Sequence, residues 1–183
     1  MKNIVIAIIG EICSGKSTIA EKIKELDPNC LTISFGDYLK EYCKNNNISY
    51  EKNRKILQDI GQSFIQKDAD MFLKDVIEHY NPHPRQILLF EGIRHTDIFF
   101  SLKKNFENFK SIFIDEPIDI RYKRYILREK DIDRNVVFED FIKINEHIVE
   151  IEIKSLKQYC ELILVPSAKP DIQKQISNLL SRY

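Results

Sequence analysis

The residues with the clearest chemistry form the run GEICSGKS at positions 10–17. It matches the pattern GxxxxGK[ST], in which backbone N–H groups of a tight loop face phosphate oxygens and a lysine adds positive charge. A strand-like apolar segment, 4–9, precedes the run, and helical spacing of apolar residues follows it. The order strand, loop, helix is the one that this motif requires. The sequence therefore predicts a phosphate loop that binds a nucleoside triphosphate.

The side chains of this loop have distinct expected roles. We expect Lys16 to reach the β- and γ-phosphates of ATP and Ser17 to offer its hydroxyl to Mg²⁺. The predicted nucleotide-binding residues are Gly10, Cys13, Ser14, Gly15, Lys16, Ser17 and Thr18. ATP and Mg²⁺ are thus the predicted cofactors.

Size and charge favour one domain that acts on a small molecule. The chain has 183 residues, and its 28 basic side chains equal its 28 acidic ones, so it lacks the basic field that attracts nucleic acid. Its four cysteines are scattered without metal-site spacing, which suits thiols in a reducing compartment. The apolar N-terminal run is too short for a signal peptide or a membrane span. We expect a cytoplasmic protein without membrane or nucleic-acid partners, either a monomer or a homodimer.

The pattern of elements predicts an α/β fold. After the strand at 4–9, further strands are expected at 30–35, 86–90, 111–114 and 161–165. Helices are expected at 37–44, at 50–79 with a bend near Gly61, at 96–105 and from about 170 onward. Strands that alternate with helices imply a five-stranded parallel sheet between two helical layers, a three-layer α/β/α arrangement. Ligands of such sheets bind at the carboxyl ends of the strands.

Two clusters follow predicted strands. In FGDYLK, 35–40, Asp37 can cap a helix, and Lys40 could hold the phosphate of an acceptor; a merely well-capped helix is the alternative. In EGIRHT, 91–96, the Glu91 carboxylate could hold water on Mg²⁺ or accept a proton. Arg94 has the planar fork that grips a phosphate with two hydrogen bonds, although Glu91 and Arg94 could instead form a surface pair.

A third cluster is a series of arginines, namely Arg121, Arg124, Arg128 and Arg134. The first three share one face at helical spacing, which is unfavourable unless an anion lies opposite. A transferring phosphoryl group is such an anion, and a closing arginine segment would neutralise its developing charge. A solvated charged helix is the alternative.

In this order the motifs resemble those of nucleoside monophosphate kinases. The adenylate-kinase pattern of a phosphate loop, a TGDxLR turn, a DGFPRT strand end and an arginine-rich lid is similar to GEICSGKS, FGDYLK, EGIRHT and RYKRYILREKDIDR. The resemblance implies a single P-loop kinase domain, 1–183, with core 1–35, 86–120 and 136–183, an acceptor-binding arm 36–85 and a lid 121–135. It departs from adenylate kinases at Phe35 and Lys40 and in lacking a proline before Arg94.

The same resemblance implies roles for individual residues. Lys16 and Ser17 belong to the donor and its magnesium, and Glu91 takes the acidic role at the strand end. Asp37, Lys40 and Arg94 belong to the monophosphate side. The residues implied in the lid are Arg124, Arg128 and Arg134, and those implied in catalysis are Lys16, Glu91, Arg94, Arg124 and Arg128.

A further element leaves the acceptor open. The run RKILQDIG, 54–61, resembles an RxxLQxxG element of phage-type deoxynucleoside monophosphate kinases and of dephospho-coenzyme-A-kinase-like proteins. It would place Arg54 and Gln58 near the acceptor; an amphipathic helix is the alternative. We therefore expect transfer of the γ-phosphoryl group of ATP·Mg²⁺ to a (deoxy)nucleoside monophosphate, or to dephospho-coenzyme A.

A hydrolase competes with the kinase. The run SIFIDE, 111–116, looks like a Walker B strand, in which Asp115 would serve magnesium and Glu116 would activate water. The arginine helix directly after it fits the kinase better. A polynucleotide end kinase is disfavoured by the zero net charge.

Overall fold

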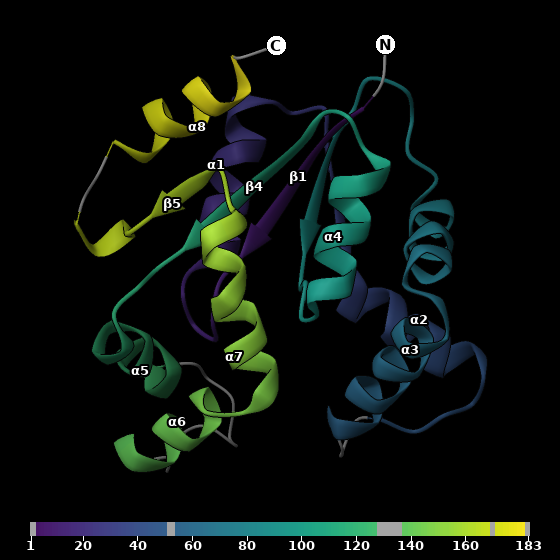
Figure 1. Ribbon diagram of the computed structural model, residues 1–183, viewed down its shortest axis with the longest axis horizontal. Coiled ribbons are helices and arrows are strands. Elements are labelled where there is room, and N and C mark those ends of the chain that lie inside the picture. Colours follow the sequence, from purple (N-terminus) through teal and green to yellow (C-terminus); the bar gives the residue numbers. More distant parts are fainter. Residues whose placement is uncertain (1–2, 51–53, 128–136, 169–170, 182–183) are drawn as a thin grey trace. The chain divides into compact units, whose positions relative to one another are not determined.

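The computed structural model describes residues 3–50, 54–127, 137–168 and 171–181. Five parallel strands form one sheet in the order β2-β3-β1-β4-β5, flanked by helices (Figure 1), which confirms the predicted fold class. The strands are β1 (Ile4–Ile9), β2 (Cys30–Ser34), β3 (Ile87–Glu91), β4 (Phe109–Ile114) and β5 (Leu162–Leu164).

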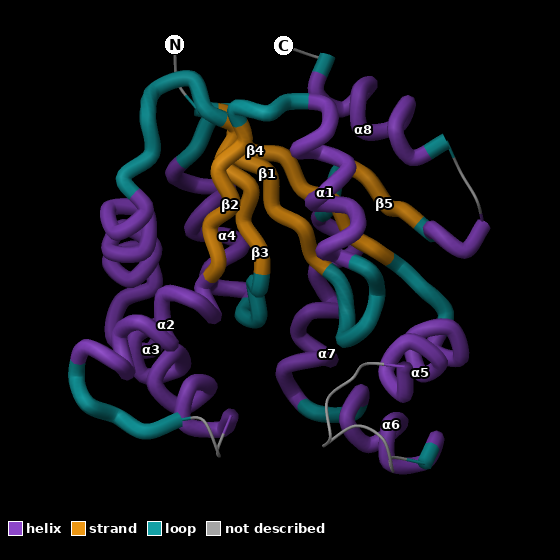
Figure 2. Tube along the Cα trace, turned by 180° about the vertical axis from the view of Figure 1, so that it is seen from behind, coloured by secondary structure: helices purple, strands orange, loops and turns teal. Residues whose placement is uncertain are grey.

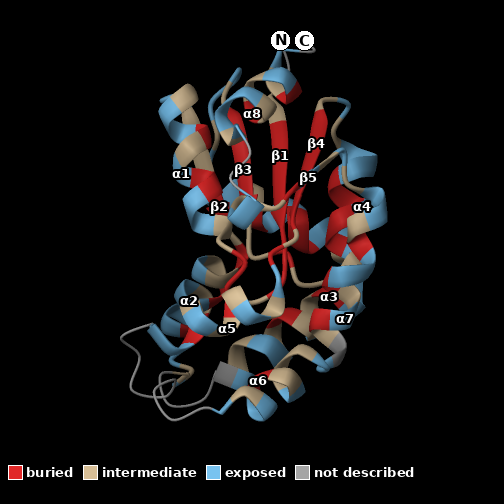
Figure 3. Ribbon diagram, turned by 90° about the vertical axis from the view of Figure 1, so that its left-hand side faces the viewer, coloured by how far each residue is buried: buried red, intermediate tan, exposed pale blue. Residues whose placement is uncertain are grey.

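Strands β1 and β3, which precede the phosphate loop and the EGIRHT run, are almost entirely apolar and buried (Figure 3). Residues Val5 to Ile9 of β1 have no exposed surface, and neither do Leu89 and Phe90 of β3. Uninterrupted apolar runs are typical of parallel strands that are covered on both faces. Their burial fixes the backbone from which the following loops project.

The chain forms two compact units. The first comprises residues 1–7 and 29–109, and the second comprises 8–28 and 110–183. The division into core, arm and lid that the sequence suggested stays a prediction.

The first unit contains β2, β3, α2 (Phe35–Asn45), α3 (Arg54–Tyr80) and α4 (Thr96–Asn105). β2 pairs with β3 in parallel from Cys30 opposite Ile87 to Ser34 opposite Glu91, so both strands end side by side (Figure 2). The Ser34 hydroxyl accepts a hydrogen bond from the Asp37 N–H at 3.2 Å and begins α2. Phe35 therefore belongs to the helix rather than to the strand, where the sequence analysis placed it.

Helix α3 bends at a different residue from the one predicted. Gly61 lies in regular helix, whereas Asp68 has extended backbone angles, φ −170° and ψ 105°. The Asp68 carboxylate accepts a hydrogen bond from the Met71 N–H at 2.9 Å, which is the geometry of an N-cap. Asp68 thus ends one helical segment and starts the next, and the bend near Gly61 was wrong.

The second unit contains α1 (Lys16–Leu26), β4, β5, α5 (Ile118–Leu127), α6 (Phe138–Asn145), α7 (Ile148–Ser155) and α8 (Ile172–Leu180). Short 3-10 turns, η1 (Leu156–Tyr159) and η2 (Pro166–Ala168), flank β5. β4 pairs with β5 in parallel from Ile112 opposite Leu162 to Ile114 opposite Leu164. Helices α6 and α7 occupy a stretch to which the sequence analysis assigned no element. None of the described helices has the length and apolar character needed to cross a bilayer.

Candidate functional site

The N-terminus of α1 lies open to an anion. Gly15 occupies the N-cap position with φ 95°, a left-handed conformation that glycine adopts without strain, and no side chain caps the helix. The first turn also lacks an acidic residue. The N–H groups and the positive dipole end of α1 are therefore available to phosphate oxygens.

The loop before α1 is tightly folded. A Cβ atom on Gly10 would lie 2.6 Å from the Ser14 hydroxyl oxygen and 2.9 Å from the carbonyl oxygen of Ile114, so only glycine fits. Cys13 adopts a left-handed conformation with φ 60°. The Ser14 hydroxyl is buried and has no hydrogen-bond partner within the described part of the chain. A buried polar atom without a partner is costly, and a phosphate oxygen would satisfy it. The loop thus fits the predicted nucleotide.

Lys16 lies folded over the loop. Its ammonium group donates hydrogen bonds to the carbonyl oxygens of Gly10 at 2.7 Å and Glu11 at 2.8 Å. These two bonds hold the positive charge at the loop itself, where the motif requires it. Ser17 and Thr18, on the first turn of α1, are exposed.

Arg124 of α5 lies against the same loop. Its Nη1 donates to the carbonyl oxygens of Ser14 at 3.0 Å and Cys13 at 3.3 Å, and a Cβ atom on Gly15 would lie 3.1 Å from it. Its Nη2 pairs with the carboxylate of Glu116. The structure therefore brings Arg124, which is more than 100 residues away along the chain, to the phosphate loop at Cys13 and Ser14.

Arg121 has a different environment from the one that the sequence suggested. It is 4% exposed, and its guanidinium pairs with Glu11 of the loop at 3.1 Å. The same group donates to the carbonyl oxygen of Glu116 at 3.1 Å and to the side chain of Asn145. The anion opposite Arg121 is thus a protein carboxylate.

A second buried carboxylate also holds the loop. Glu150 of α7 is 6% exposed and accepts a hydrogen bond from the Ile12 N–H at 3.0 Å. Sequence reasoning missed Glu11, Arg121, Asn145 and Glu150 as supports of the loop. Three of them are far from the motif along the chain, and no local pattern links them to the loop.

The two acids after β4 are held by cations of the protein. Asp115 pairs with Lys157 at 2.7 Å. The Glu116 side chain has no exposed surface and binds Arg124 as well as the Ser167 N–H, the latter at 2.8 Å. These contacts disfavour the hydrolase interpretation, in which Asp115 serves magnesium and Glu116 activates water.

In the first unit, the start of α2 brings a carboxylate and a cation together. Asp37 and Lys40 form an ion pair of 2.7 Å, and more than half of each side chain is exposed. The hydrogen bond from Lys40 is the main cause that lowers the pKa of Asp37, although partial burial opposes it. Asp37 is therefore ionised at neutral pH, and Lys40 already has an anionic neighbour.

The other predicted acceptor and metal residues have the following places. Glu91 ends β3 directly opposite Ser34, and Arg94 follows it in the loop before α4; both are partly buried. Gln58 is exposed on α3, which begins at Arg54. Arg128 and Arg134 lie outside the described residues.

Comparison with known proteins places the chain in a family. A family model described as an AAA domain matches residues 6–141, which include most of β1, the phosphate loop, β2 to β4 and α5. The chain belongs to this family.

Relatives of this AAA-domain chain include named kinases. A uridine kinase of Borrelia hermsii is 29% identical over 188 residues, covering 87% of this chain and 85% of that protein. A uridine kinase of Borreliella burgdorferi strain ZS7 is 28% identical over 186 residues, with the same coverage.

Solved structures share the fold. TT1252 from Thermus thermophilus superposes with a TM-score of 0.65 at 14% identity, covering 100% of this chain and 98% of that one. Shikimate kinase from Bacteroides thetaiotaomicron has a TM-score of 0.59 at 11% identity, covering 97% and 98%. The family, the phosphate loop and the named relatives together support an ATP-dependent phosphotransferase of the P-loop kinase type.

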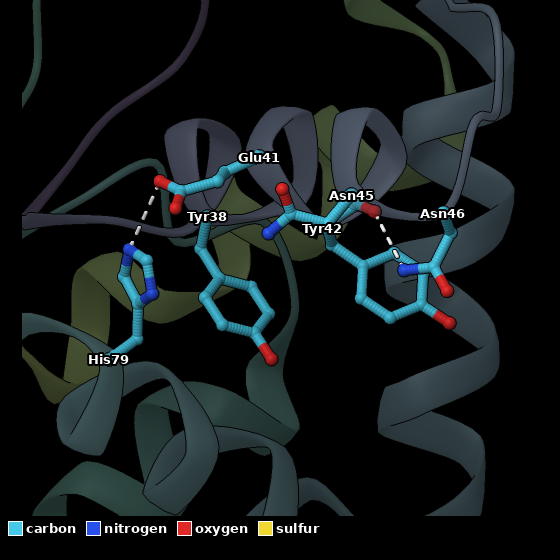
Figure 4. A pocket seen from close by; sticks show the side chains of 6 residues that line it. All are labelled: Tyr38, Glu41, Tyr42, Asn45, Asn46 and His79. Carbon is cyan, nitrogen blue, oxygen red and sulfur yellow. Dashed lines mark hydrogen bonds and ion pairs between the residues drawn. The ribbon is translucent and has the colours of Figure 1, made fainter.

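The first unit of this chain also has a small hollow outside the predicted site (Figure 4). It measures about 180 Å³ and is lined by Tyr38, Glu41, Tyr42, Asn45, Asn46 and His79. His79 pairs with Glu41 across it at 3.3 Å, and burial raises the pKa of the Tyr38 hydroxyl. None of the predicted acceptor residues lines this hollow.

Proposed function

We propose that the protein transfers the γ-phosphoryl group of ATP·Mg²⁺ to a (deoxy)nucleoside monophosphate. The observation that supports phosphoryl transfer is the structure of the phosphate loop. The helix N-terminus after the loop is uncapped, and the buried Ser14 hydroxyl has no partner within the described part of the chain. Two cations, Lys16 and Arg124, bind carbonyl oxygens of the loop. The monophosphate acceptor is supported by the motifs FGDYLK and EGIRHT at the ends of β2 and β3.

In this proposal the chain contributes binding and charge. An oxygen of the acceptor phosphate attacks the γ-phosphorus in line, the bond to the β–γ bridging oxygen breaks, and ADP leaves with that oxygen. Lys16 moves from the loop carbonyls to the β- and γ-phosphates, and Arg124 neutralises the charge that develops during transfer. Because a phosphate acceptor is already an anion, the reaction needs no general base.

Magnesium fits the proposed donor site. Ser17, exposed on the first turn of α1, and Glu91, at the end of β3, would hold it. When bound there, the ion would neutralise part of the negative charge of the donor phosphates. Within the described ranges, no group of three or more His, Cys, Asp or Glu could hold a metal ion.

The acceptor side rests on residues of the first unit and of the arginine segment. Lys40 and Arg94 would bind the acceptor phosphate, and Asp37 would hold Lys40 in place through their ion pair. Arg54 and Gln58 would contact the rest of the acceptor. Arg128 and Arg134, which lie outside the described residues, are proposed by resemblance to bind the phosphates.

A nucleoside is the second candidate acceptor, because the two relatives reported above are uridine kinases and align with 87% of this chain. A hydroxyl acceptor must lose a proton, and so it needs a base. Asp37 is an ionised carboxylate at the start of α2, but its lowered pKa makes it a weak base. We therefore keep the monophosphate, which needs no base, as the first candidate acceptor and the nucleoside as the second.

A coupled assay of ADP release decides between the acceptors. The panel contains ribo- and deoxynucleoside monophosphates, uridine and other nucleosides, and dephospho-coenzyme A, each with ATP·Mg²⁺. We expect turnover with one or a few monophosphates, and none with Lys16→Ala at unchanged thermal stability. Turnover with nucleosides alone would establish the second candidate. Turnover with dephospho-coenzyme A alone would indicate that sister activity, and ADP release independent of any acceptor would contradict phosphotransfer.

A further inference from the structure

Glu116 is a buried carboxylate that the mechanism above does not use. It follows β4 directly, and its side chain has no exposed surface. A buried carboxylate is costly unless hydrogen bonds and an opposite charge compensate it. Both compensations are present here, and they come from different parts of the second unit.

The two oxygens of Glu116 have separate partners. Oε2 pairs with Nη2 of Arg124, and Oε1 accepts a hydrogen bond from the Ser167 N–H at 2.8 Å. Ser167 belongs to η2, just after β5. The carboxylate therefore connects a backbone group beyond the edge strand with the guanidinium that binds the phosphate loop.

Arg124 depends on this carboxylate for its direction. Its side chain is 38% exposed, so solvent would otherwise compete for it. With Nη2 held by Glu116, Nη1 is directed to the carbonyl oxygens of Cys13 and Ser14. Fixing a guanidinium in advance reduces the entropy that is lost when it acts on a ligand.

We propose that Glu116 is a positioning residue of the donor site, which holds Arg124 at the phosphate loop and anchors it to the backbone of Ser167. This inference rests on the proposed function, since it assumes that Arg124 acts on the phosphates of ATP. It assigns to Glu116 a structural task at the site in place of water activation.

Replacing Glu116 by glutamine tests the proposal sharply. Both oxygens of Glu116 accept hydrogen bonds, whereas an amide has one oxygen and one NH₂ group. In Glu116→Gln the NH₂ group must face either Arg124 or the Ser167 N–H, donor against donor. We therefore expect Arg124 to leave the loop.

The measurement is calorimetric binding of ATP·Mg²⁺ and of inorganic tripolyphosphate·Mg²⁺ without an acceptor. We expect Glu116→Gln and Arg124→Gln each to raise both dissociation constants about tenfold. The double variant should also be about tenfold weaker rather than about a hundredfold, because both changes remove the same interaction. Glu116→Asp, which keeps the charge, should recover part of the affinity and provides the test if the glutamine variant does not fold.

Two variants serve as matched controls. Asp115→Asn neutralises the neighbouring acid, which pairs with Lys157 and not with Arg124. Ser167→Ala removes a hydroxyl but keeps the N–H that Glu116 binds. Both should bind as the wild type does.

The outcomes distinguish a failure of the proposed function from a failure of the role assigned to Glu116. A wild type that fails to bind ATP would overturn the proposed function and this inference with it. If the wild type binds ATP, two results would overturn only the role of Glu116. One is an unchanged affinity in Glu116→Gln. The other is a loss of affinity on adding Glu116→Gln to Arg124→Gln that is as large as in the wild type. A lower melting temperature with unchanged tripolyphosphate affinity would also overturn it.

Discussion

At the scale of single residues, the chemistry of the phosphate loop was predictable and its support was not. The GxxxxGK[ST] pattern identifies Lys16 because phosphate binding constrains residues that are adjacent in sequence. Arg121 and Glu150 bind the loop from positions more than 100 residues away, at Glu11 and Ile12. Such contacts depend on tertiary packing, which leaves no local pattern to recognise.

Arg94→Ala tests the assignment of the acceptor site at this scale. We expect the KM for the acceptor to rise at least tenfold with a smaller change in the KM for ATP, because a charge-assisted contact to the acceptor phosphate is lost. Initial-rate kinetics over both substrates provide the measurement. Lys103→Ala, which removes an exposed cation of the first unit, is the control. Unchanged kinetic constants in Arg94→Ala would show that the acceptor phosphate lies elsewhere.

Arg121→Met tests the contribution to stability of the buried ion pair between Arg121 and Glu11 of the phosphate loop. Removing the guanidinium leaves the buried Glu11 carboxylate without its partner, and breaking a buried ion pair in this way costs about 3–5 kcal/mol. Urea unfolding measures the loss. Lys123→Met, an exposed change on the same helix, should alter stability by less than about 0.5 kcal/mol. Glu11→Gln combined with Arg121→Met should restore part of the loss; equal stability of Arg121→Met and wild type would refute the argument.

At the scale of elements, apolar runs predicted the strands well, because a strand in a parallel sheet is buried on both faces. Boundaries were less certain. Ser34 caps α2 and moves Phe35 into the helix, and the Asp68 cap bends α3 seven residues beyond Gly61, where the bend was expected. Both differences come from side-chain to backbone hydrogen bonds, which compete locally with apolar spacing.

A contact between α3 and α4 gives the stability a defined dependence on pH. The Asp70 carboxylate accepts hydrogen bonds from Lys104 at 2.7 Å, from Ser101 and from Asn105 at 3.0 Å, and these lower its pKa to about 2. A lowered pKa in the folded state means that the contribution to stability is complete above the unfolded value near 4 and is lost as the pH falls toward 2.

Asp70→Asn should remove this dependence. We expect the difference in urea midpoint between the wild type and Asp70→Asn to be constant above about pH 5 and to shrink steadily as the pH falls toward 2. Parallel urea titrations from pH 6 to pH 2 measure it. Asp59→Asn, an exposed change elsewhere on α3, should show no such trend. A difference that is as large at pH 2 as at pH 6 would mean that the carboxylate charge is not its cause.

At the scale of the whole molecule, the order of motifs along the chain predicted the fold class and the P-loop kinase type. The acceptor was less predictable, because the sequence relatives are named uridine kinases whereas the solved structures that share the fold include a shikimate kinase. Proteins that share this fold place the phosphoryl donor in the same position, whereas a few side chains on variable elements select the acceptor.

Binding of the donor should stabilise the entire protein. At a concentration of ATP·Mg²⁺ about 100 times its dissociation constant, binding adds about 2.7 kcal/mol. For a chain of this size we expect the melting temperature to rise by roughly 5–10 °C, measured by calorimetry or dye-based melting. Lys16→Ala should abolish the rise, and Lys24→Ala, an exposed change on the same helix, should preserve it. A wild type that melts at the same temperature with and without ATP would contradict donor binding.

The pair of Glu11 and Arg121 also limits how this sequence can change over generations. The phosphate-loop motif leaves position 11 open to any residue, but here that position faces a buried guanidinium at 3.1 Å. A single replacement at either position leaves the other charge buried without compensation. Such a replacement is destabilising, so each residue disfavours the replacement of the other. Descendants of this chain should replace the two residues together or keep both. Position 11, which the motif leaves variable, should therefore vary only together with position 121.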